Sequence, residues 1–464
     1  MATIEGGTQA SAPLPADDPR QVLGNRAMTK PQYLVVAICI LVNMVDGYDI
    51  LAISLAGSAL KAEWALSDAA LGTLLAMHLA GMAVGALSVS PVADQWGRRP
   101  AILTCLLIMS AGMALAALTQ SYQQMVAARI LTGIGIGGMT STVGMIALEY
   151  ASFRRREFAA SAVASAYPVG TIIGAWVAAT TLDGLDWRAI FWAGSALSAL
   201  LFPLAFVLLP ESLDFLLSRQ PKGALGRTNS MLDRMAIARI DALPPKPTGS
   251  KSAVLAEILQ GFHVRELGKL FLAHALNMFA WYFIIQWGPR LVDEAAGSLV
   301  AGANYAAWVS YGGIAGGLTA GYLCGKIGER RIMWATMLGL AVLIAAFGQL
   351  AGAGTGLLLI APLIGAMLFG SATANWLTIA YAFPPQLRAT GLGFATTAGR
   401  IGAVFGPIFG GLLLNTRETG ALEIAGISVP MTLDLGSVCL IMAIPAVLSA
   451  ITFSTARRVE PERK

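Results

Sequence analysis

The sequence has 464 residues, of which 56% are hydrophobic and 12% are charged, and its formal net charge is +5. Because ordinary soluble domains carry about 25% charged residues, this composition excludes a soluble enzyme and predicts that lipid surrounds most side chains. The basic residues are scattered between apolar runs, which argues against a nucleic-acid-binding protein.

Residues 1–31 are polar and lack the apolar segment of a cleavable signal peptide, so we expect a disordered cytoplasmic tail. Twelve apolar stretches of about 20 residues or more follow, which is the length of a bilayer-spanning α-helix. They cover residues 32–60, 68–92, 101–119, 123–149, 157–181, 188–209, 267–292, 301–325, 331–351, 355–383, 389–414 and 430–455. Barrel strands would be about half as long and would alternate in polarity, so the sequence predicts an all-α membrane protein.

A long polar break divides the twelve predicted helices into two sets of six. The N-terminal half covers residues 32–209 and the C-terminal half covers residues 267–455. Residues 210–266 form the central loop between them, and residues 456–464 form a C-terminal tail. We expect the central loop and both tails to be cytoplasmic.

Lysine and arginine set the predicted orientation. Most of the 31 basic residues lie in the two tails, the central loop and the loops on the same side. The opposite side holds only Lys61, Arg188, Arg290 and Arg417. Because basic loops stay in the cytoplasm, we expect a multi-pass protein of the bacterial inner membrane with both termini inside.

The two halves resemble each other in sequence. Residues 94–99 (DQWGRR) follow the second predicted helix, and residues 325–331 (GKIGERR) follow the eighth. A constant shift of 232 residues relates Arg156, Gly170 and Gly174 to Arg388, Gly402 and Gly406. A duplicated six-helix half, with a substrate near the midplane between the halves, is typical of secondary transporters.

Charged residues inside predicted helices are costly in lipid and therefore point to function. Asp46 and Asp49 are three residues apart and share a face of the first predicted helix, so their charges repel and one carboxyl group can carry a proton. We place Asp49 ahead of Asp46 in this role, with Arg129 as the partner that modulates it. The alternative is an Asp–Arg bridge that only fixes two helices.

Arg400 is the second buried charge of interest, because the helix rise places it near the midplane of the helix at 389–414. A guanidinium group stays charged and binds both oxygens of a carboxylate, so Arg400 is the candidate site for an anionic substrate. The alternative is a structural arginine paired with helix carbonyls or with an acid.

Aromatic and polar side chains at the central depth are candidates for the walls of a substrate site. They are His78, Tyr167, Asn277, Trp281, Tyr282, Gln286, Tyr305, Trp308, Tyr311, Asn375, Trp376 and Tyr381, with His274 ranked below them. We expect Tyr305, Trp308 and Tyr311 to line one side of their helix. His78 is predicted to bind a ring hydroxyl or relay a proton; the alternative for any of these residues is packing or interfacial anchoring.

The loop after the second helix resembles a motif of the major facilitator superfamily. Asp94, Gly97, Arg98 and Arg99 match it, and Ser90 replaces the usual glycine. The fourth helix carries the arginine and glycine spacing of the same superfamily as Arg129, Gly133, Gly135 and Gly137. This resemblance covers essentially the whole chain and implies the major facilitator fold. It also implies that Asp94 and Arg98, with Arg99 and Glu149 nearby, act as a gate between the halves. The second copy of the loop has Gly325 at the aspartate position, so the gating contact that it forms is expected to be weak.

Two further motifs narrow the resemblance. Asp46-Gly47-Tyr48-Asp49 and Gly399-Arg400, followed by Gly402, Gly406 and Pro407, resemble the aromatic acid:proton symporters. This resemblance implies uptake of benzoate-like acids, such as hydroxybenzoates or gentisate, together with protons by alternating access. We expect no cofactor and a functional monomer in the lipid bilayer.

The sequence argues against some other functions and leaves others open. The sequence shows no metal-ligand spacing, phosphate-binding loop or nucleophile elbow, which argues against ATP-driven transport and against an intramembrane enzyme. A proton-coupled porter for another organic anion or sugar, a drug/proton antiporter and a membrane sensor of aromatic acids stay open. Four cysteines, Cys39, Cys105, Cys324 and Cys439, lie in apolar runs and are interpreted as packed hydrophobic residues.

Overall fold

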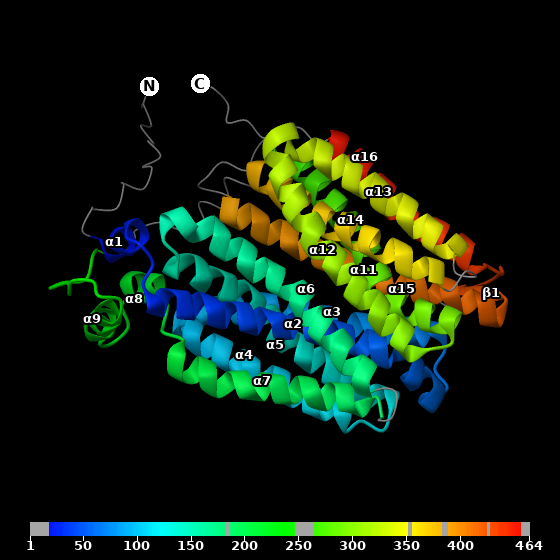
Figure 1. Cartoon of the computed structure of the whole chain (residues 1–464), viewed down its shortest axis with the longest axis horizontal. Coiled ribbons are helices and arrows are strands. Elements are labelled where there is room, and N and C mark those ends of the chain that lie inside the picture. The colour runs from blue at the N-terminus through cyan, green and yellow to red at the C-terminus, as the bar shows by residue number, and fades with distance from the viewer. Residues whose placement is uncertain are drawn as a thin grey trace, which may run out of the picture.

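The computed structural model describes residues 18–181, 186–245, 263–350, 355–382, 388–424 and 427–455. Twelve long helices run roughly parallel to one another and make up most of it (Figure 1). The N-terminal half consists of α2 (Lys30–Trp64), α3 (Asp68–Trp96), α4 (Arg98–Ala117), α5 (Tyr122–Tyr150), α6 (Arg156–Thr181) and α7 (Arg188–Leu208). The C-terminal half consists of α11 (His263–Ala296), α12 (Leu299–Ile327), α13 (Glu329–Leu350), α14 (Thr355–Ala382), α15 (Arg388–Thr419) and α16 (Leu435–Thr455).

Each of the twelve predicted spans corresponds to one of these long helices, which confirms the all-α prediction. Eleven helices in the described part of the chain are long and apolar enough to cross a membrane. The other, α12, has 29 residues, but its glycines and polar side chains lower its mean hydropathy. The protein is therefore embedded in a membrane and crosses it many times.

Glycines set the distance between neighbouring helices in both halves. Gly170 on α6 lies against the carbonyl group of Met44 on α2, so that a Cβ atom would collide with it. Gly402 on α15 has the same relation to the carbonyl group of Ala275 on α11. Small residues let helix backbones approach in this way. The two glycines are 232 residues apart, so the duplication in the sequence is also a duplication in packing.

The two halves lie side by side along the bundle (Figure 1), with the N-terminal half in blue to green and the C-terminal half in yellow-green to red. The helix pairs that pack across the boundary include α3 with α15, α6 with α12, α2 with α11 and α2 with α12. A site enclosed by these helices can therefore draw residues from both halves.

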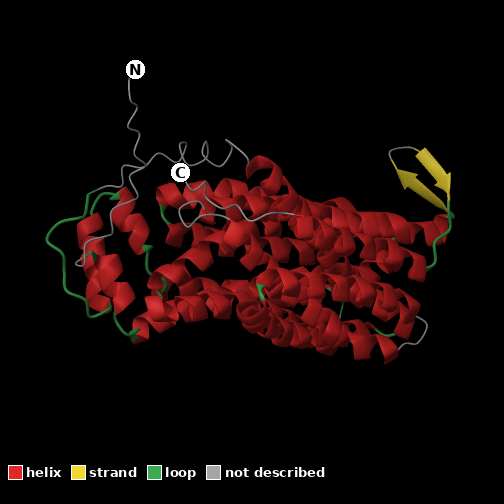
Figure 2. Ribbon diagram, turned by 90° about the horizontal axis from the view of Figure 1, so that it is seen from above, coloured by secondary structure: helices red, strands yellow, loops and turns green. Residues whose placement is uncertain are grey.

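The ends of the bundle differ (Figure 2). A β-hairpin of β1 (Ala421–Ile424) and β2 (Ile427–Pro430) projects from one end, here called the hairpin end. The short helices α1 (Pro19–Asn25), α8 (Leu213–Arg219) and α9 (Ala224–Arg234) cover the other, here called the central-loop end. The hairpin corrects the prediction that the last helix begins at residue 430. That helix begins at Leu435, after Asp434, whose carboxylate accepts a hydrogen bond from the Ser437 amide.

Helix α1 corrects the prediction that residues 1–31 are wholly disordered; residues 1–17 lie outside the described residues. Asp18 caps it by accepting a hydrogen bond from the Arg20 amide, and Pro19 suits the first turn. Burial by itself would raise the pKa of Asp18, but the hydrogen bonds and charge of Arg20 lower it below the usual value. Gly24 packs against the ring of Phe153, which holds α1 on the bundle.

Candidate functional site

Asp49 on α2 and Arg129 on α5 form a fully buried ion pair. Two guanidinium nitrogens of Arg129 donate to the two carboxylate oxygens of Asp49, at 2.7 and 2.8 Å. Both side chains have 0% exposure, and the Arg129 guanidinium also lies over the ring of Phe191. This bidentate geometry satisfies the charge of Asp49 within the N-terminal half.

Asp46, one turn earlier on α2, has very different surroundings. Its side chain is 4% exposed, and Oδ2 accepts only a long hydrogen bond of 3.4 Å from the Thr140 hydroxyl. Oδ1 has no hydrogen-bond partner among the described residues. A buried carboxylate in this state is costly unless it is protonated or paired with a ligand.

Arg400 brings a positive charge from the opposite half to the same region. It lies on α15, is partly buried, and its Nη1 is 3.3 Å from the Met82 sulfur on α3. Met82 belongs to the N-terminal half, so the Arg400 side chain reaches across the boundary between the halves.

Four aromatic rings adjoin these charges. Tyr167 on α6 lies 6.1 Å from Trp281 and 6.0 Å from Phe369, measured between ring centroids. Trp281 lies 4.8 Å from Tyr282 on α11 and 5.6 Å from Phe369 on α14. Gly47, the residue after Asp46, packs against the backbone carbonyl of Tyr167. We call Tyr167, Trp281, Tyr282 and Phe369 the aromatic cluster.

Polar groups of the C-terminal half lie beside Arg400. His274 on α11 contacts Gly399, the residue before Arg400, and its ring Nδ1 is hydrogen-bonded to the Asn375 amide on α14. Asn277 accepts a 3.5 Å hydrogen bond from Ser371. Asn277 Nδ2, Asn375 Oδ1 and Trp281 Nε1 are buried without a hydrogen-bond partner among the described residues. These atoms are free to bind polar groups of a ligand.

His78 and Gln286 connect the two halves near the same depth. Gln286 on α11 donates to the Leu75 carbonyl on α3 at 3.3 Å, and its amide nitrogen is 3.5 Å from His78 Nε2. The hydroxyl of Ser54 on α2 donates to the Gln286 carbonyl at 2.5 Å. These two predicted site residues therefore lie on the boundary between the halves.

Of the other predicted wall residues, Tyr305 lines one small cavity between the halves together with Tyr167, whereas Trp308, Tyr311 and Trp376 do not join the aromatic cluster. Tyr305 is buried against Phe347 of α13, whereas Trp308 and Tyr311 are each 49% exposed, which corrects the prediction that the three line one side of the helix. At about 100° per residue, a spacing of three drifts about 60° each time around a helix. Trp376 is 53% exposed, and the side chain of Tyr381 lies outside the described residues.

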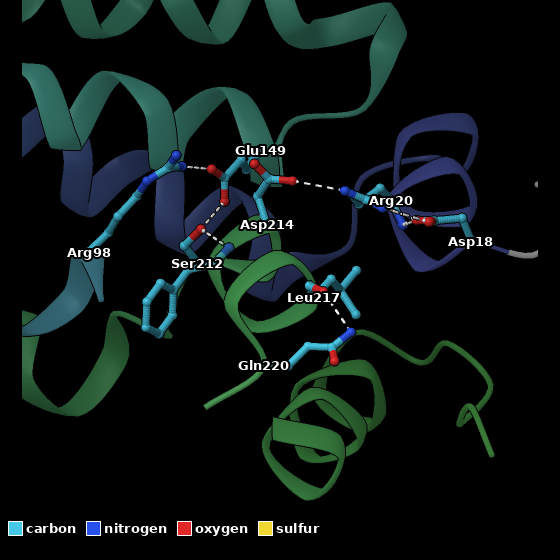
Figure 3. Close-up of polar contacts among 9 residues, drawn as sticks. Asp18, Arg20, Arg98, Glu149, Ser212, Asp214, Leu217 and Gln220 are labelled. Carbon is cyan, nitrogen blue, oxygen red and sulfur yellow. Dashed lines mark hydrogen bonds and ion pairs between the residues drawn. The ribbon is translucent and has the colours of Figure 1, made fainter. Parts of the chain in front are cut away.

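Gating candidates meet at the central-loop end of the N-terminal half, where Arg98 forms an ion pair with Glu149 (Figure 3). Glu149 also accepts a 2.6 Å hydrogen bond from the Ser212 hydroxyl. Asp214 on α8 pairs with Arg20 of α1 at 3.1 Å. We call Arg98, Glu149, Glu211 and Ser212 the central-loop network.

Glu211 is the part of this network that the sequence motif did not assign. Its carboxylate accepts hydrogen bonds from the backbone amides of Arg98 and Arg99 at 2.8 and 3.0 Å, and so caps α4. Gly97 sits between α3 and α4 at φ +113°, which an L side chain rarely adopts. Asp94 contributes its backbone carbonyl, which accepts from Arg219 at 3.1 Å. Gly97 thus allows the turn between α3 and α4, and the hydrogen bonds to Glu211 stabilise that turn.

Sequence reasoning missed Phe369, Met82, Thr140 and Ser371. Phenylalanine, methionine and hydroxyl residues are common in any apolar helix, so their types give no signal until the packing brings them beside Asp46 and Arg400. Among the described residues, no group of His, Cys, Asp or Glu side chains is arranged to hold a metal ion. The residues of both halves together supply a guanidinium group, a carboxyl group and four aromatic rings.

Comparisons with known proteins agree with this architecture. The sequence matches the profile of the Major Facilitator Superfamily over residues 36–407 and, in an overlapping match, over residues 270–464. The solved xylose transporter XylE from E. coli, in a partially occluded inward-open conformation, superposes with a TM-score of 0.70 at 17% identity, covering 94% of this chain and all of that chain.

Curated relatives of similar length are transporters. The 4-hydroxybenzoate transporter PcaK of Acinetobacter baylyi is 25% identical over 437 residues, covering 93% of this chain and 94% of its own. The gallate transporter of Pseudomonas putida is 26% identical over 406 residues, covering 86% and 90%. The gentisate transporter of Corynebacterium glutamicum is 26% identical over 426 residues, covering 89% of both chains. With the profile match spanning most of its length, this chain belongs to the major facilitator superfamily of membrane transporters.

Proposed function

We propose that the protein carries aromatic carboxylates, such as hydroxybenzoates, gallate or gentisate, into the cytoplasm together with protons. The observation that carries this proposal is that Arg400 of one half reaches Met82 of the other, that Asp46 has a buried carboxylate oxygen without a hydrogen-bond partner among the described residues, and that the aromatic cluster draws rings from both halves. The similar 4-hydroxybenzoate, gallate and gentisate transporters support the same substrate class.

The substrate carboxylate binds Arg400 in this proposal. Among the described residues the guanidinium group has a thioether, Met82, as its hydrogen-bond partner. A thioether is a weak acceptor, so a carboxylate ligand improves the interaction greatly. The ring of the substrate then packs against Tyr167, Trp281 and Phe369, whose edges and faces suit another aromatic ring.

The proton is carried by Asp46. A substrate carboxylate on Arg400 would be repelled by an ionised Asp46, and protonation of Asp46 removes that repulsion. The acid and the proton therefore bind better together than separately, which is the differential binding that coupling requires. Asp49 keeps its bidentate pair with Arg129 and positions α2 on α5.

Transport follows from rocking of the two halves about this central site. The distribution of lysine and arginine supports a cytoplasmic central-loop end and cytoplasmic termini in the bacterial inner membrane. The central-loop network, with Asp94 and Arg99 beside it, controls how the N-terminal half moves. The protein acts as a monomer because each half supplies its own part of the site.

Ligand binding to the purified protein tests the proposed substrate class. Titration with 4-hydroxybenzoate, gallate and gentisate is expected to quench or shift tryptophan fluorescence, since Trp281 lies in the aromatic cluster. The response should be lost in Trp281→Phe, while Trp376→Phe, outside the cluster, should keep it. A protein that responds to none of these acids but binds a sugar or a lipophilic cation would contradict the proposal.

A further inference from the structure

A stripe of three side chains on α11 faces α14 in the central site. His274, Asn277 and Trp281 follow one another at spacings of three and four residues, which places them on one face of the helix. The His274 ring is hydrogen-bonded to the Asn375 amide on α14. Asn277 Oδ1 lies 3.5 Å from the Ser371 hydroxyl on the same helix. Two polar contacts therefore lie next to each other between α11 and α14.

This stripe leads from the neighbourhood of Arg400 to the aromatic cluster. Gly399, the residue before Arg400 on α15, packs against the His274 ring. At the other end of the stripe, Trp281 is a member of the aromatic cluster. Asn277 lies between His274 and Trp281 along α11. A ligand held between Arg400 and the aromatic cluster is therefore expected to lie beside Asn277.

Three buried polar atoms of this region have no hydrogen-bond partner among the described residues. They are Asn277 Nδ2, Asn375 Oδ1 and Trp281 Nε1. The two asparagines are 0% exposed and Trp281 is 6% exposed. Because an unpaired polar atom away from water is costly, a ligand that pairs with these atoms gains affinity. We call Asn277, Asn375 and Trp281 the polar triad.

Other buried polar side chains of α14 are satisfied within their own helix. The Ser371 hydroxyl donates to the Leu368 carbonyl, and the Thr378 hydroxyl donates to the Ala374 carbonyl, both at 2.7 Å. Asn375 lies between Ser371 and Thr378 in the sequence, yet its side-chain oxygen has no such partner among the described residues. Unused hydrogen-bonding capacity therefore distinguishes the polar triad from its surroundings.

The polar triad presents donors and an acceptor together. The amide nitrogen of Asn277 and the indole nitrogen of Trp281 donate, whereas the amide oxygen of Asn375 accepts. A phenolic hydroxyl group both donates and accepts, so it can pair with both kinds of atom. A carboxylate only accepts, and the guanidinium group of Arg400 binds it more strongly. An unsubstituted ring offers the triad nothing.

We propose that the polar triad recognises a ring hydroxyl group of the substrate, so that the transporter selects hydroxylated benzoates over benzoate itself. The inference rests on the proposed function, because it needs the carboxylate on Arg400 and the ring in the aromatic cluster. The hydroxyl group donates to Asn375 and accepts from Asn277 or Trp281. A site built in this way rejects an analogue without the hydroxyl group, since its own buried polar atoms are then left unpaired.

Calorimetric titration of the purified full-length protein tests this selection without any variant. The ligands are benzoate, its three monohydroxy derivatives and the matching methoxybenzoates, which cannot donate a hydrogen bond. At least one hydroxybenzoate is expected to bind about tenfold or more tightly than benzoate and than its own methyl ether, equivalent to about 1.4 kcal/mol.

The two possible failures of this titration have different meanings. Equal affinity for benzoate and for all three hydroxybenzoates would overturn the role of the polar triad and leave aromatic acid transport standing. Binding of none of these acids by folded protein would contradict the proposed function and this inference with it.

Variants assign the selection to the polar triad. Asn277→Leu removes the amide at similar side-chain size, so affinity for the preferred hydroxybenzoate should fall about tenfold while affinity for benzoate stays unchanged or rises. Asn375→Leu should act in the same direction. Thr378→Val is the matched control, because it removes a buried hydroxyl group of α14 that already has a partner, and it should keep the preference.

The quantity to compare is the ratio of the two affinities in each protein. A general loss of structure lowers both affinities and cancels in this ratio, as in a double-mutant cycle. The ratio is expected to approach one in Asn277→Leu and Asn375→Leu and to keep its native value in Thr378→Val. A native ratio in both folded asparagine variants would overturn the proposal.

Discussion

Two aspartates on one turn of α2 face different partners, and this difference divides their roles. Asp49 is held by two hydrogen bonds from Arg129, whereas Asp46 has one free carboxylate oxygen among the described residues. The sequence predicts that both acids share one face of the helix and that Asp49, ahead of Asp46, carries the proton. We therefore propose Asp46 as the proton carrier. Spacing along α2 could not give this order, because it does not show which partners on other helices each acid meets.

Neutralising Asp46 should uncouple transport without blocking binding. Asp46→Asn removes the proton-carrying group, so uphill accumulation should be lost while exchange of acid across the membrane continues. Exchange of labelled for unlabelled 4-hydroxybenzoate in proteoliposomes, compared with uptake against a gradient, measures the difference. Proton-driven accumulation that survives in this variant would remove Asp46 from the coupling role.

Neutralising Asp49 should mainly cost stability. Asp49→Asn leaves the buried Arg129 charge uncompensated, a loss of about 3–5 kcal/mol in comparable pairs. Thermal unfolding of the detergent-purified protein should show a lower transition for Asp49→Asn than for Asp46→Asn. Adding Arg129→Gln should restore part of the loss. Equal transitions for the two single variants would contradict the structural role of the pair.

Binding of the acid should require the planar guanidinium group of Arg400 as well as its positive charge. Arg400→Gln should weaken acid binding by about 2 kcal/mol or more, roughly thirtyfold in affinity. Arg400→Lys keeps the charge but loses the two parallel hydrogen bonds, so it should fall between Gln and the native residue. Fluorescence titration with 4-hydroxybenzoate gives the order; equal affinity of all three proteins would exclude Arg400 from the site.

Helices and their approximate bounds could be predicted well from apolar length, because lipid leaves the backbone few alternatives. The hairpin between α15 and α16 and the short helix α1 could not, since each is short and depends on contacts made elsewhere. The wall formed by Tyr305, Trp308 and Tyr311 failed for a related reason. Spacing along a helix gives the angle between side chains but not the neighbour that each one meets.

A methyl group in place of a glycine hydrogen should destabilise the protein where that glycine packs against a neighbouring helix. Gly402→Ala forces a Cβ atom into the Ala275 carbonyl on α11, and overpacking of this kind costs about 1–3 kcal/mol. Gly144→Ala, where the Cβ atom has open space, should leave the melting temperature unchanged or slightly raised. Thermal unfolding of the two variants side by side checks this. A stable Gly402→Ala variant would show that the two helices can separate without cost.

The two halves together make the site, since Asp46 and Tyr167 come from one half and Arg400, Trp281 and Phe369 from the other. The duplicated motifs predicted the two halves and a site between them. They did not predict Glu211 in the central-loop network or the Asp68–Arg290 ion pair between α3 and α11, because these contacts join residues far apart in the chain. In the proposed mechanism, coupling depends on one site that both halves share.

The most direct test is uptake of labelled 4-hydroxybenzoate, gallate and gentisate into proteoliposomes, with and without an inward proton gradient. At least one acid is expected to accumulate above its external concentration, and an uncoupler is expected to abolish this accumulation. Accumulation that is indifferent to the proton gradient, or uptake of none of the acids by folded protein, would contradict proton-coupled aromatic acid transport.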